Sequence, residues 1–139
     1  MAAMELILKE DLLGVDWDRL AEVYRAAFGG TLDAERTRSI FGRCYLTRIA
    51  LLDGAEVGGV YALCDGELDA AIYGLAVHPG FHRRGIGTAL MRSAIEGLPP
   101  QVAVMLTADE PWLVEFYREL GFARLKNAMA LRFPEHAVD

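Results

Sequence analysis

The stretch Leu75-Ala-Val-His-Pro-Gly-Phe-His-Arg-Arg-Gly-Ile-Gly-Thr-Ala-Leu-Met91 joins an apolar run to a Pro-Gly break, a basic turn with glycines and an amphipathic helix. This order predicts a strand that leads into a helix N-terminus, where unpaired N–H groups carry partial positive charge. Gly85 and Gly87 have no side chains, so a phosphate can approach the backbone closely. Arg83 and Arg84 add positive charge in a chain whose formal net charge is -6. The stretch therefore predicts an anion-binding turn.

The turn does not match the common nucleotide-binding motifs. A P-loop needs a Gly-Lys pair, and a Rossmann fingerprint needs three spaced glycines with a distant acidic residue. Neither pattern occurs here. Taken alone, the Gly-x-Gly pattern is also typical of a tight connection that binds nothing. Arg83 and Arg84 are likewise compatible with a solvated surface pair.

A second informative segment is Phe116-Tyr-Arg-Glu-Leu-Gly-Phe122. It is typical of the end of an amphipathic helix, closed by Gly121 and followed by a return to a strand. By itself, the aromatic pair at 116–117 is compatible with a core-facing helix surface.

Together, in this order and spacing, the two segments resemble the GNAT superfamily of acetyl-CoA-dependent N-acetyltransferases. His82 stands where Arg or Gln is usual in the family's acetyl-CoA motif, and Arg83 and Arg84 can supply the charge. In the second segment Tyr117 falls on the position of a family tyrosine that points toward the CoA sulfur and acts as general acid. The residues that match the first motif are Val77, Pro79, Gly85 and Gly87.

The resemblance implies that acetyl-CoA is the co-substrate. In the family, the pantetheine arm lies in a gap between splayed fourth and fifth strands, and a glycine turn holds the pyrophosphate. Carried over residue by residue, the expected cofactor-binding positions are Leu75, Ala76, Val77, His82, Arg83, Arg84, Gly85, Ile86, Gly87, Thr88, Phe116 and Tyr117.

A base must also remove a proton from the acceptor amine, because an alkyl amine with a pKa of about 10.4 arrives protonated. Asp69 and Tyr73 are four residues apart on the strand that leads to the turn, so they are expected on one face. With Tyr117 they are the candidate catalytic residues. Glu67 and Glu110 are weaker alternatives, and Asp69 is equally compatible with a solvated carboxylate at a strand end.

The function implied is direct acetyl transfer from acetyl-CoA to a primary amine in a ternary complex. The expected acceptor is a small amine or an arylalkylamine. A protein lysine, an N-terminal amine, a non-catalytic acetyl-CoA-binding module and a small α/β domain with another phosphate ligand remain alternatives. Residues 32–43, the strand at 69–73 and the region of Trp112 are expected to shape the acceptor site, although Trp112 also fits a core position.

Periodicity and turn signals predict one α/β (α+β) domain over residues 1–139, in the order β-α-α-β-β-β-α-β-α-β. The resemblance implies the GNAT fold, with a mixed sheet of about six to seven strands. Asp53-Gly54 and Asp65-Gly66 predict hairpins, and Gly58-Gly59 marks a bulge. The run at 102–107 is continuously apolar, as in a strand buried on both faces. The expected strands are 4–9, 45–52, 56–64, 68–77, 102–107 and 124–133, and the expected helices are 16–28, 32–43, 85–97 and 111–120.

The amino-acid composition narrows the remaining classes of function and location. The acidic balance disfavours nucleic acid as the main partner, because phosphate backbones need a basic face. No apolar run reaches the about 18 residues of a membrane span, and the N-terminus lacks a basic leader region. Two cysteines, Cys44 and Cys64, make no disulfide framework and are expected to be small buried residues. We therefore expect a cytoplasmic enzyme without a metal. Many members of the family form dimers, so the resemblance also implies that a homodimer can form.

Overall fold

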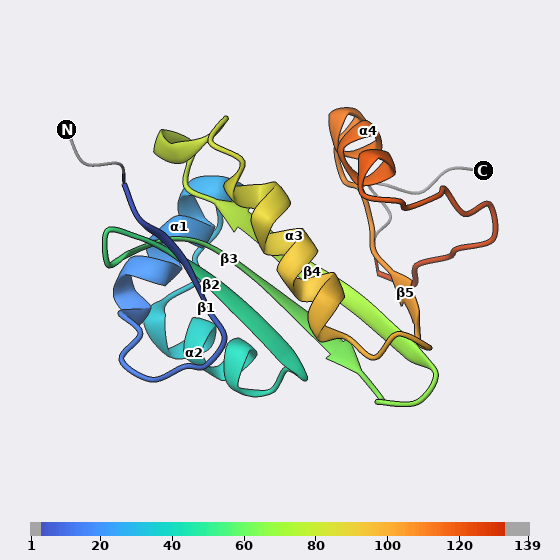
Figure 1. Cartoon of the computed structure of the whole chain (residues 1–139), viewed down its shortest axis with the longest axis horizontal. Helices are drawn as coiled ribbons and strands as arrows, with labels where there is room; N and C mark the ends of the chain where they lie inside the picture. The colour runs from blue at the N-terminus through green and yellow to red at the C-terminus, as the bar shows by residue number, and fades with distance from the viewer. Residues whose placement is uncertain (1–3, 133–139) are drawn as a thin grey trace. The chain divides into compact units, whose positions relative to one another are not determined.

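The computed structural model describes residues 4–132, which fall into two compact units divided after Leu106. The described residues form a five-strand mixed sheet and four α-helices (Figure 1). In the first unit the elements are β1 (Leu6–Lys9), α1 (Trp17–Phe28), α2 (Ala34–Gly42), β2 (Leu46–Leu52), β3 (Ala55–Cys64), β4 (Asp69–Val77), the 3-10 turn η1 (Pro79–Phe81), α3 (Ile86–Gly97) and β5 (Ala103–Met105). The second unit contains α4 (Pro111–Glu119).

The sheet of the first unit runs in the order β1-β2-β3-β4-β5. Strands β1 to β4 pair antiparallel, and β5 pairs parallel to β4 after the crossover through α3. Two adjacent glycines of β3 show which helices cover which face. A Cβ on Gly58 would meet Leu90 of α3, whereas a Cβ on Gly59 would meet Tyr24 of α1 and Phe41 of α2. Helix α3 therefore covers one face, and α1 and α2 cover the other.

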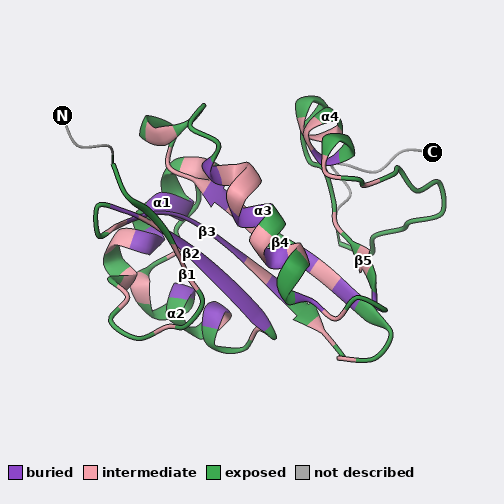
Figure 2. Cartoon of the chain, in the orientation of Figure 1, coloured by how far each residue is buried: buried purple, intermediate pink, exposed green. Residues whose placement is uncertain are grey.

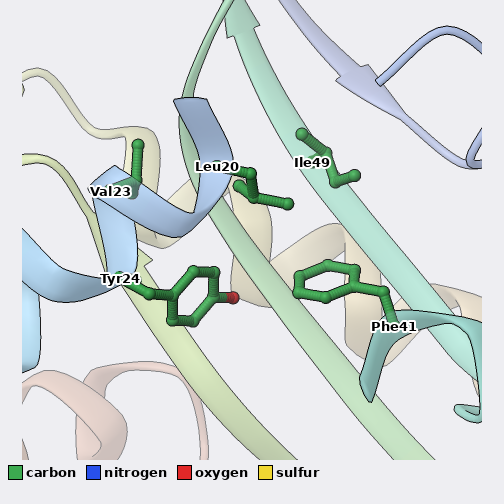
Figure 3. Close-up of a cluster of buried hydrophobic side chains, with 6 residues drawn as sticks. Leu20, Val23, Tyr24, Phe41 and Ile49 are labelled. Carbon is green, nitrogen blue, oxygen red and sulfur yellow. The ribbon is translucent and has the colours of Figure 1, made fainter. Parts of the chain in front are cut away.

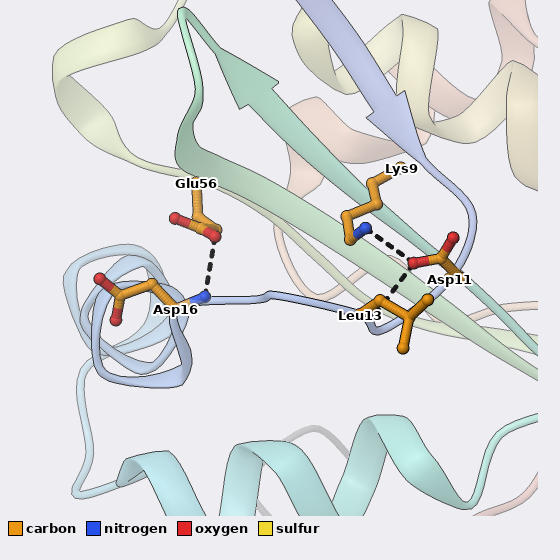
Figure 4. A network of polar contacts seen from close by, with 5 residues as sticks. All are labelled: Lys9, Asp11, Leu13, Asp16 and Glu56. Carbon is orange, nitrogen blue, oxygen red and sulfur yellow. Dashed lines mark hydrogen bonds and ion pairs between the residues drawn. The ribbon is translucent and has the colours of Figure 1, made fainter.

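An aspartate side chain caps the start of each of the two early helices, α1 and α2. Asp16 accepts a hydrogen bond from the Arg19 N–H, and Asp33 accepts one from the Arg36 N–H. The backbone N–H of Asp16 in turn donates to Glu56 of β3, at 2.9 Å (Figure 4). This bond joins the start of α1 to the sheet.

The core between α1, α2 and the sheet is largely aromatic and aliphatic (Figure 3). Figure 2 shows β2 buried along nearly its whole length, as its burial pattern requires. Phe41 packs edge-on against Trp17, Tyr24 and Tyr61. Such pairs add to the stabilisation from buried apolar area. The buried members of the cluster are Leu20, Val23, Tyr24, Phe41, Ile49 and Ala76.

The predicted hairpins are confirmed. Asp53 and Gly54 both have positive φ, at 50° and 84°, which is the two-residue turn that matches strand twist. Asp65 organises the next loop differently: its Oδ1 accepts hydrogen bonds from the backbone N–H groups of Glu67, Leu68 and Asp69. These bonds hold the pKa of Asp65 below its ordinary value.

The bulge expected near Gly58-Gly59 is present, because the β2–β3 register shifts between Ala50 and Leu51, beside Gly58. A second bulge, which we did not expect, lies in β4. There the register shifts between the pairs Gly59–Ala76 and Tyr61–Tyr73, so one residue of β3 stands opposite two of β4. Gly74 lies in this bulge with φ +63°, and a Cβ there would collide with the Tyr61 ring. Only glycine suits that position.

Three expectations about strands and burial are wrong. Strand β5 covers only Ala103–Met105, and two of its three side chains are exposed, because it has a single neighbour and pairs over three residues. Residues 124–132 contain no strand, so the described residues form a sheet of five strands rather than six to seven; Phe133 lies outside the described residues. An alternating apolar pattern indicates an extended conformation, but a strand also needs a neighbouring strand to pair with. Finally, Cys44 and Cys64 are half-buried free thiols rather than fully buried ones.

Candidate active site

The Gly-rich stretch forms a compact turn between β4 and α3. The N–H of His78 donates to Val57 O at 2.8 Å, and η1 follows at once. The ring of His78 accepts a bond from the Gly80 N–H at 3.1 Å. Gly85 precedes α3 in the left-handed region, with φ 76° and ψ 10°. Eight residues, 78–85, thus join the end of β4 to the start of α3.

The first turn of α3 leaves backbone donors free. The first helical bond at this end runs from the Ala89 N–H to Gly85 O at 3.0 Å, and no side chain caps the terminus. The N–H groups at 86–88 therefore have no acceptor among residues 4–132. The side chain of Ile86 is buried, so only its N–H is available to a ligand. This terminus can accept an anion.

The three basic side chains of the turn differ in their contacts. His82 Nε2 lies 3.0 Å from Val77 O, and because a carbonyl only accepts, this nitrogen is the donor. Arg84 lies over the Phe81 ring, 5.4 Å from its centroid. Arg83 is exposed, with φ 65°, and makes no ion pair among the described residues. Arg83 is therefore the turn's most available cation.

Strand β4 has a free edge beside this turn. Its pairing with β5 covers only Asp69–Ala103, Ala70–Val104 and Ala71–Met105. From residue 72 to 77 the same edge of β4 has no strand partner within the described part of the chain. An extended ligand can pair with such an edge as an added strand does. Leu75, Ala76 and Val77 lie on this segment, as the sequence predicts.

The candidate bases Asp69 and Tyr73 also lie on β4. Both are exposed, and the buried Ala70 and Ile72 between them point to the face of α3. Asp69 and Tyr73 thus share the opposite face, as their spacing predicts. Both residues therefore belong to the strand that carries the free edge.

The predicted acid Tyr117 lies in the second unit, on α4. It is 8% exposed and packs edge-on against Phe116 and Phe122. Burial, with Asp109 nearby, raises the pKa of the Tyr117 hydroxyl above its ordinary value. Gly121 closes the helix with φ 101°, as expected. Trp112, considered as a core or acceptor-site residue, is 66% exposed, so the core interpretation is wrong.

A buried tyrosine of α1 supports the β4 bulge, and sequence reasoning missed its role. The Tyr24 hydroxyl donates to Gly74 O at 2.6 Å, and burial raises its pKa well above the ordinary value. Apolar spacing along residues 16–28 indicates only that Tyr24 faces the core. The available signal was glycine inside two strands, at Gly59 and Gly74, which marks close approach of other groups.

Two further observations concern the described residues as a whole. Between residues 4 and 132, no three His, Cys, Asp or Glu side chains are placed to hold a metal ion together. None of the helices in that range combines the length and apolar character that a bilayer crossing requires.

Comparison with known proteins points to one family. Residues 42–124 match the family model described as "Acetyltransferase (GNAT) domain". This range is more than half of the chain and runs from the end of α2 past α4. "Uncharacterized N-acetyltransferase ycf52" of Porphyra purpurea is 32% identical over 69 residues, which cover 49% of this chain and 40% of that protein. The matched segment thus spans less than half of that relative's length.

Solved structures agree with the match. A candidate acetyltransferase of Deinococcus radiodurans is similar with a TM-score of 0.79 and 33% identity, over 91% of this chain and 87% of that one. A GNAT family protein of Streptococcus pneumoniae gives a TM-score of 0.77 at 26% identity, over 93% and 97% of the two chains. With the free strand edge, the open helix terminus and these matches in agreement, we conclude that the chain belongs to the GNAT family of acetyltransferases.

Proposed function

We propose that this protein transfers the acetyl group of acetyl-CoA to a primary amine by direct attack. The observation that carries the proposal is the continuity of β4 with α3. Within residues 4–132, the strand edge that is free from residue 72 is followed, after the turn at 78–85, by a helix terminus with three unpaired N–H groups. The strand edge can thereby hydrogen-bond to an extended chain of amides, and the helix terminus can bind a phosphate.

The residues of the turn fit acetyl-CoA. Leu75, Ala76 and Val77 would pair with the amides of the pantetheine arm, and the segment 82–88 would hold the pyrophosphate. In the turn, Arg83 and Arg84 add charge, whereas Ile86, Gly87 and Thr88 would act through their N–H groups. Phe116 and Tyr117 complete the proposed cofactor site by resemblance. When bound, acetyl-CoA supplies an acetyl group already activated as a thioester.

Two side-chain roles follow from the chemistry. The amine nitrogen forms the new C–N bond with its lone pair, the C–S bond breaks, and the sulfur leaves with the electron pair. Tyr117 would donate its hydroxyl proton to that sulfur, and its raised pKa keeps the hydroxyl protonated at neutral pH. Asp69, with Tyr73 on the same face, would receive the amine's proton, directly or through water. An N–H of Ala76 or Val77 would polarise the thioester carbonyl.

The acceptor we favour is a small amine or an arylalkylamine. Protein lysines and N-terminal amines are the competing acceptors, and an acetyl-CoA-binding module without turnover is the competing class. Cytoplasmic location, the absence of a resident metal and a homodimer remain predictions of the same kind, as does a single domain over residues 1–139.

Release of free CoA thiol tests the reaction. The purified protein would receive acetyl-CoA and, separately, alkylamines, polyamines, arylalkylamines and peptides. We expect amine-dependent release that is lost in Gly87→Glu, because a carboxylate at the helix terminus repels phosphate. Cofactor binding by calorimetry without release for any amine would instead favour the binding module.

Competition identifies the ligand of the turn. Desulfo-CoA is expected to displace acetyl-CoA, whereas ATP at the same concentration is not. Displacement by ATP alone would contradict the CoA assignment and favour a small α/β domain that binds another phosphate ligand.

Tyr117→Phe tests the acid role. The variant keeps the ring that packs on Phe116 and Phe122 but removes the proton. We expect kcat to fall by about 10²–10⁴-fold, the usual contribution of general acid catalysis, with affinity for desulfo-CoA unchanged. In the wild type, the alkaline loss of kcat from this group should lie above pH 10, because its pKa is raised from 10.0. Equal kcat in the two proteins would remove Tyr117 from the mechanism.

A further inference from the structure

An open groove of about 630 Å³ lies on the sheet face opposite α3, and its floor is one apolar row. Leu63 of β3 pairs with Ala71 of β4, which pairs with Met105 of β5. Tyr45 lines the same groove at the β2 side. Tyr45, Leu63 and Met105 are 52%, 49% and 52% exposed, so this apolar row faces solvent. The groove is in the volume range typical of small-molecule sites.

The groove adjoins the free edge of β4. The pair Ala71–Met105 is the last one between β4 and β5, so the floor of the groove ends where the strands cease to pair. The thioester, if the pantetheine arm lies along residues 72–77 as proposed, would lie close to this point. A molecule in the groove therefore approaches the reacting carbon from the side of the sheet that α2 covers.

The charges that line the groove are arranged by sign. Asp69 lies in the first β4–β5 pair, two residues before Ala71 on the same strand, and within residues 4–132 its carboxylate has no hydrogen bond or ion pair. Asp65 also lines the groove, but three backbone N–H groups already engage its Oδ1. Arg43 lines the side formed by the segment between α2 and β2. A cation is thus favoured on the β4 side of the groove, at Asp69, and disfavoured on the side of Arg43.

We infer that this groove is the acceptor site and that it selects monoamines with an apolar body; the inference rests on the proposed function. The amine nitrogen lies near Asp69, which offsets its charge in the ammonium form and accepts its proton for the attack. The apolar body crosses Leu63 toward Tyr45. A polyamine would bring a second ammonium toward Arg43, and like charges in a groove reject such a ligand.

Two native thiols report on occupancy without any acetyl transfer. Cys44 and Cys64 are the chain's two cysteines, both are free and half-buried, and both line the groove. The protein would be treated with 4,4′-dithiodipyridine, a neutral thiol reagent, with and without phenylethylamine or spermidine. Cys44→Ser and Cys64→Ser variants assign each rate. At about ten times its dissociation constant, phenylethylamine should slow both thiols about tenfold, because only the free groove reacts. Spermidine should protect neither.

Leu63→Ser and Leu68→Ser form a matched pair for the apolar wall. Both leucines are exposed, at 49% and 70%, but Leu68 does not line the groove. Leu63→Ser should raise KM for phenylethylamine about tenfold through lost apolar contact, with desulfo-CoA affinity unchanged, and Leu68→Ser should change neither. Asp69→Asn should abolish protection of the thiols at the same amine concentration.

The outcomes separate the two proposals. Acetylation of phenylethylamine with both thiols unprotected would overturn the groove assignment and leave the proposed function intact. Better protection by spermidine than by phenylethylamine would overturn the inferred acceptor class. Protection of the thiols without turnover for any amine would support the groove as an amine site and count against the transferase.

Discussion

Tyr24 links three features of the first unit through one hydroxyl group. It donates to Gly74 O at 2.6 Å, its ring packs on Phe41, and a Cβ on Gly59 would lie only 2.9 Å from its oxygen. The bulge of β4 therefore rests on a buried hydrogen bond from α1. Since the free edge of β4 begins at residue 72, this bond also holds the proposed cofactor edge in place.

Tyr24→Phe removes the hydroxyl and keeps the ring. Gly74 O loses its partner in a part-buried site, so we expect the free energy of unfolding to fall by about 1–3 kcal/mol. Urea denaturation measures the change, with Tyr73→Phe, an exposed tyrosine of the same strand, as the control. The affinity for desulfo-CoA should also fall in Tyr24→Phe. A midpoint equal to that of Tyr73→Phe would contradict the role of the hydroxyl.

At the scale of elements, the helices and hairpins were predictable because their signals are local. Asp16 and Asp33 cap the helices that the apolar spacing predicts, and an Asp-Gly pair begins the loop of each predicted hairpin. The C-terminal strands were not predictable, because a strand exists only with a partner edge. The apolar runs at 102–107 and 124–133 have the pattern of strands, yet only Ala103–Met105 pairs among the described residues.

The loop between β3 and β4 gives a pH-dependent prediction. Three backbone N–H groups lower the pKa of Asp65, so its contribution to stability is present above the ordinary value of about 3.9 and is lost as pH falls through the lowered pKa. Asp65→Ala should therefore be less stable than the wild type at pH 7. The difference in stability between the two proteins should narrow only below about pH 3.9.

Thermal unfolding of both proteins from pH 7 to pH 2 measures this gap. Glu67→Ala, which removes a neighbouring loop carboxylate, serves as the control and should follow the wild type. A gap of constant size down to pH 2 would show that ionisation of Asp65 does not stabilise the loop.

At the scale of the whole molecule, the acidic net charge of -6 acts on every ligand at a distance. A monocationic acceptor is attracted, and this attraction weakens as the Debye length falls from about 30 Å at 0.01 M salt to about 8 Å at 0.15 M. We expect KM for phenylethylamine to rise severalfold over that range. The neutral analogue phenylethanol, measured as a competitive inhibitor, should keep its inhibition constant. Equal responses of the two would contradict charge attraction.

The candidate site was only partly predictable at this scale. Motif residues such as Gly85 and Arg83 lie where the sequence places them, because the strand, turn and helix are consecutive in the chain. The groove was not predictable, since Tyr45 lies just before β2 while Leu63 and Met105 lie in β3 and β5, and no local pattern encodes how these strands pair. The matched family range, 42–124, covers these residues and the turn alike.

The extra residue in β4 changes which side chains meet which layer. Tyr73 and Ala76 are three positions apart, so an uninterrupted strand would point them to opposite faces. Yet Tyr73 pairs with Tyr61, and Ala76 joins the cluster around Leu20, both on the side of α1 and α2. Odd-numbered positions face those helices before the bulge and even-numbered ones after it. Deleting Gly74 would therefore move the side chains of residues 75–77 to the opposite face of the sheet. Ala76 would leave the aromatic core, although the segment would keep all its apolar residues.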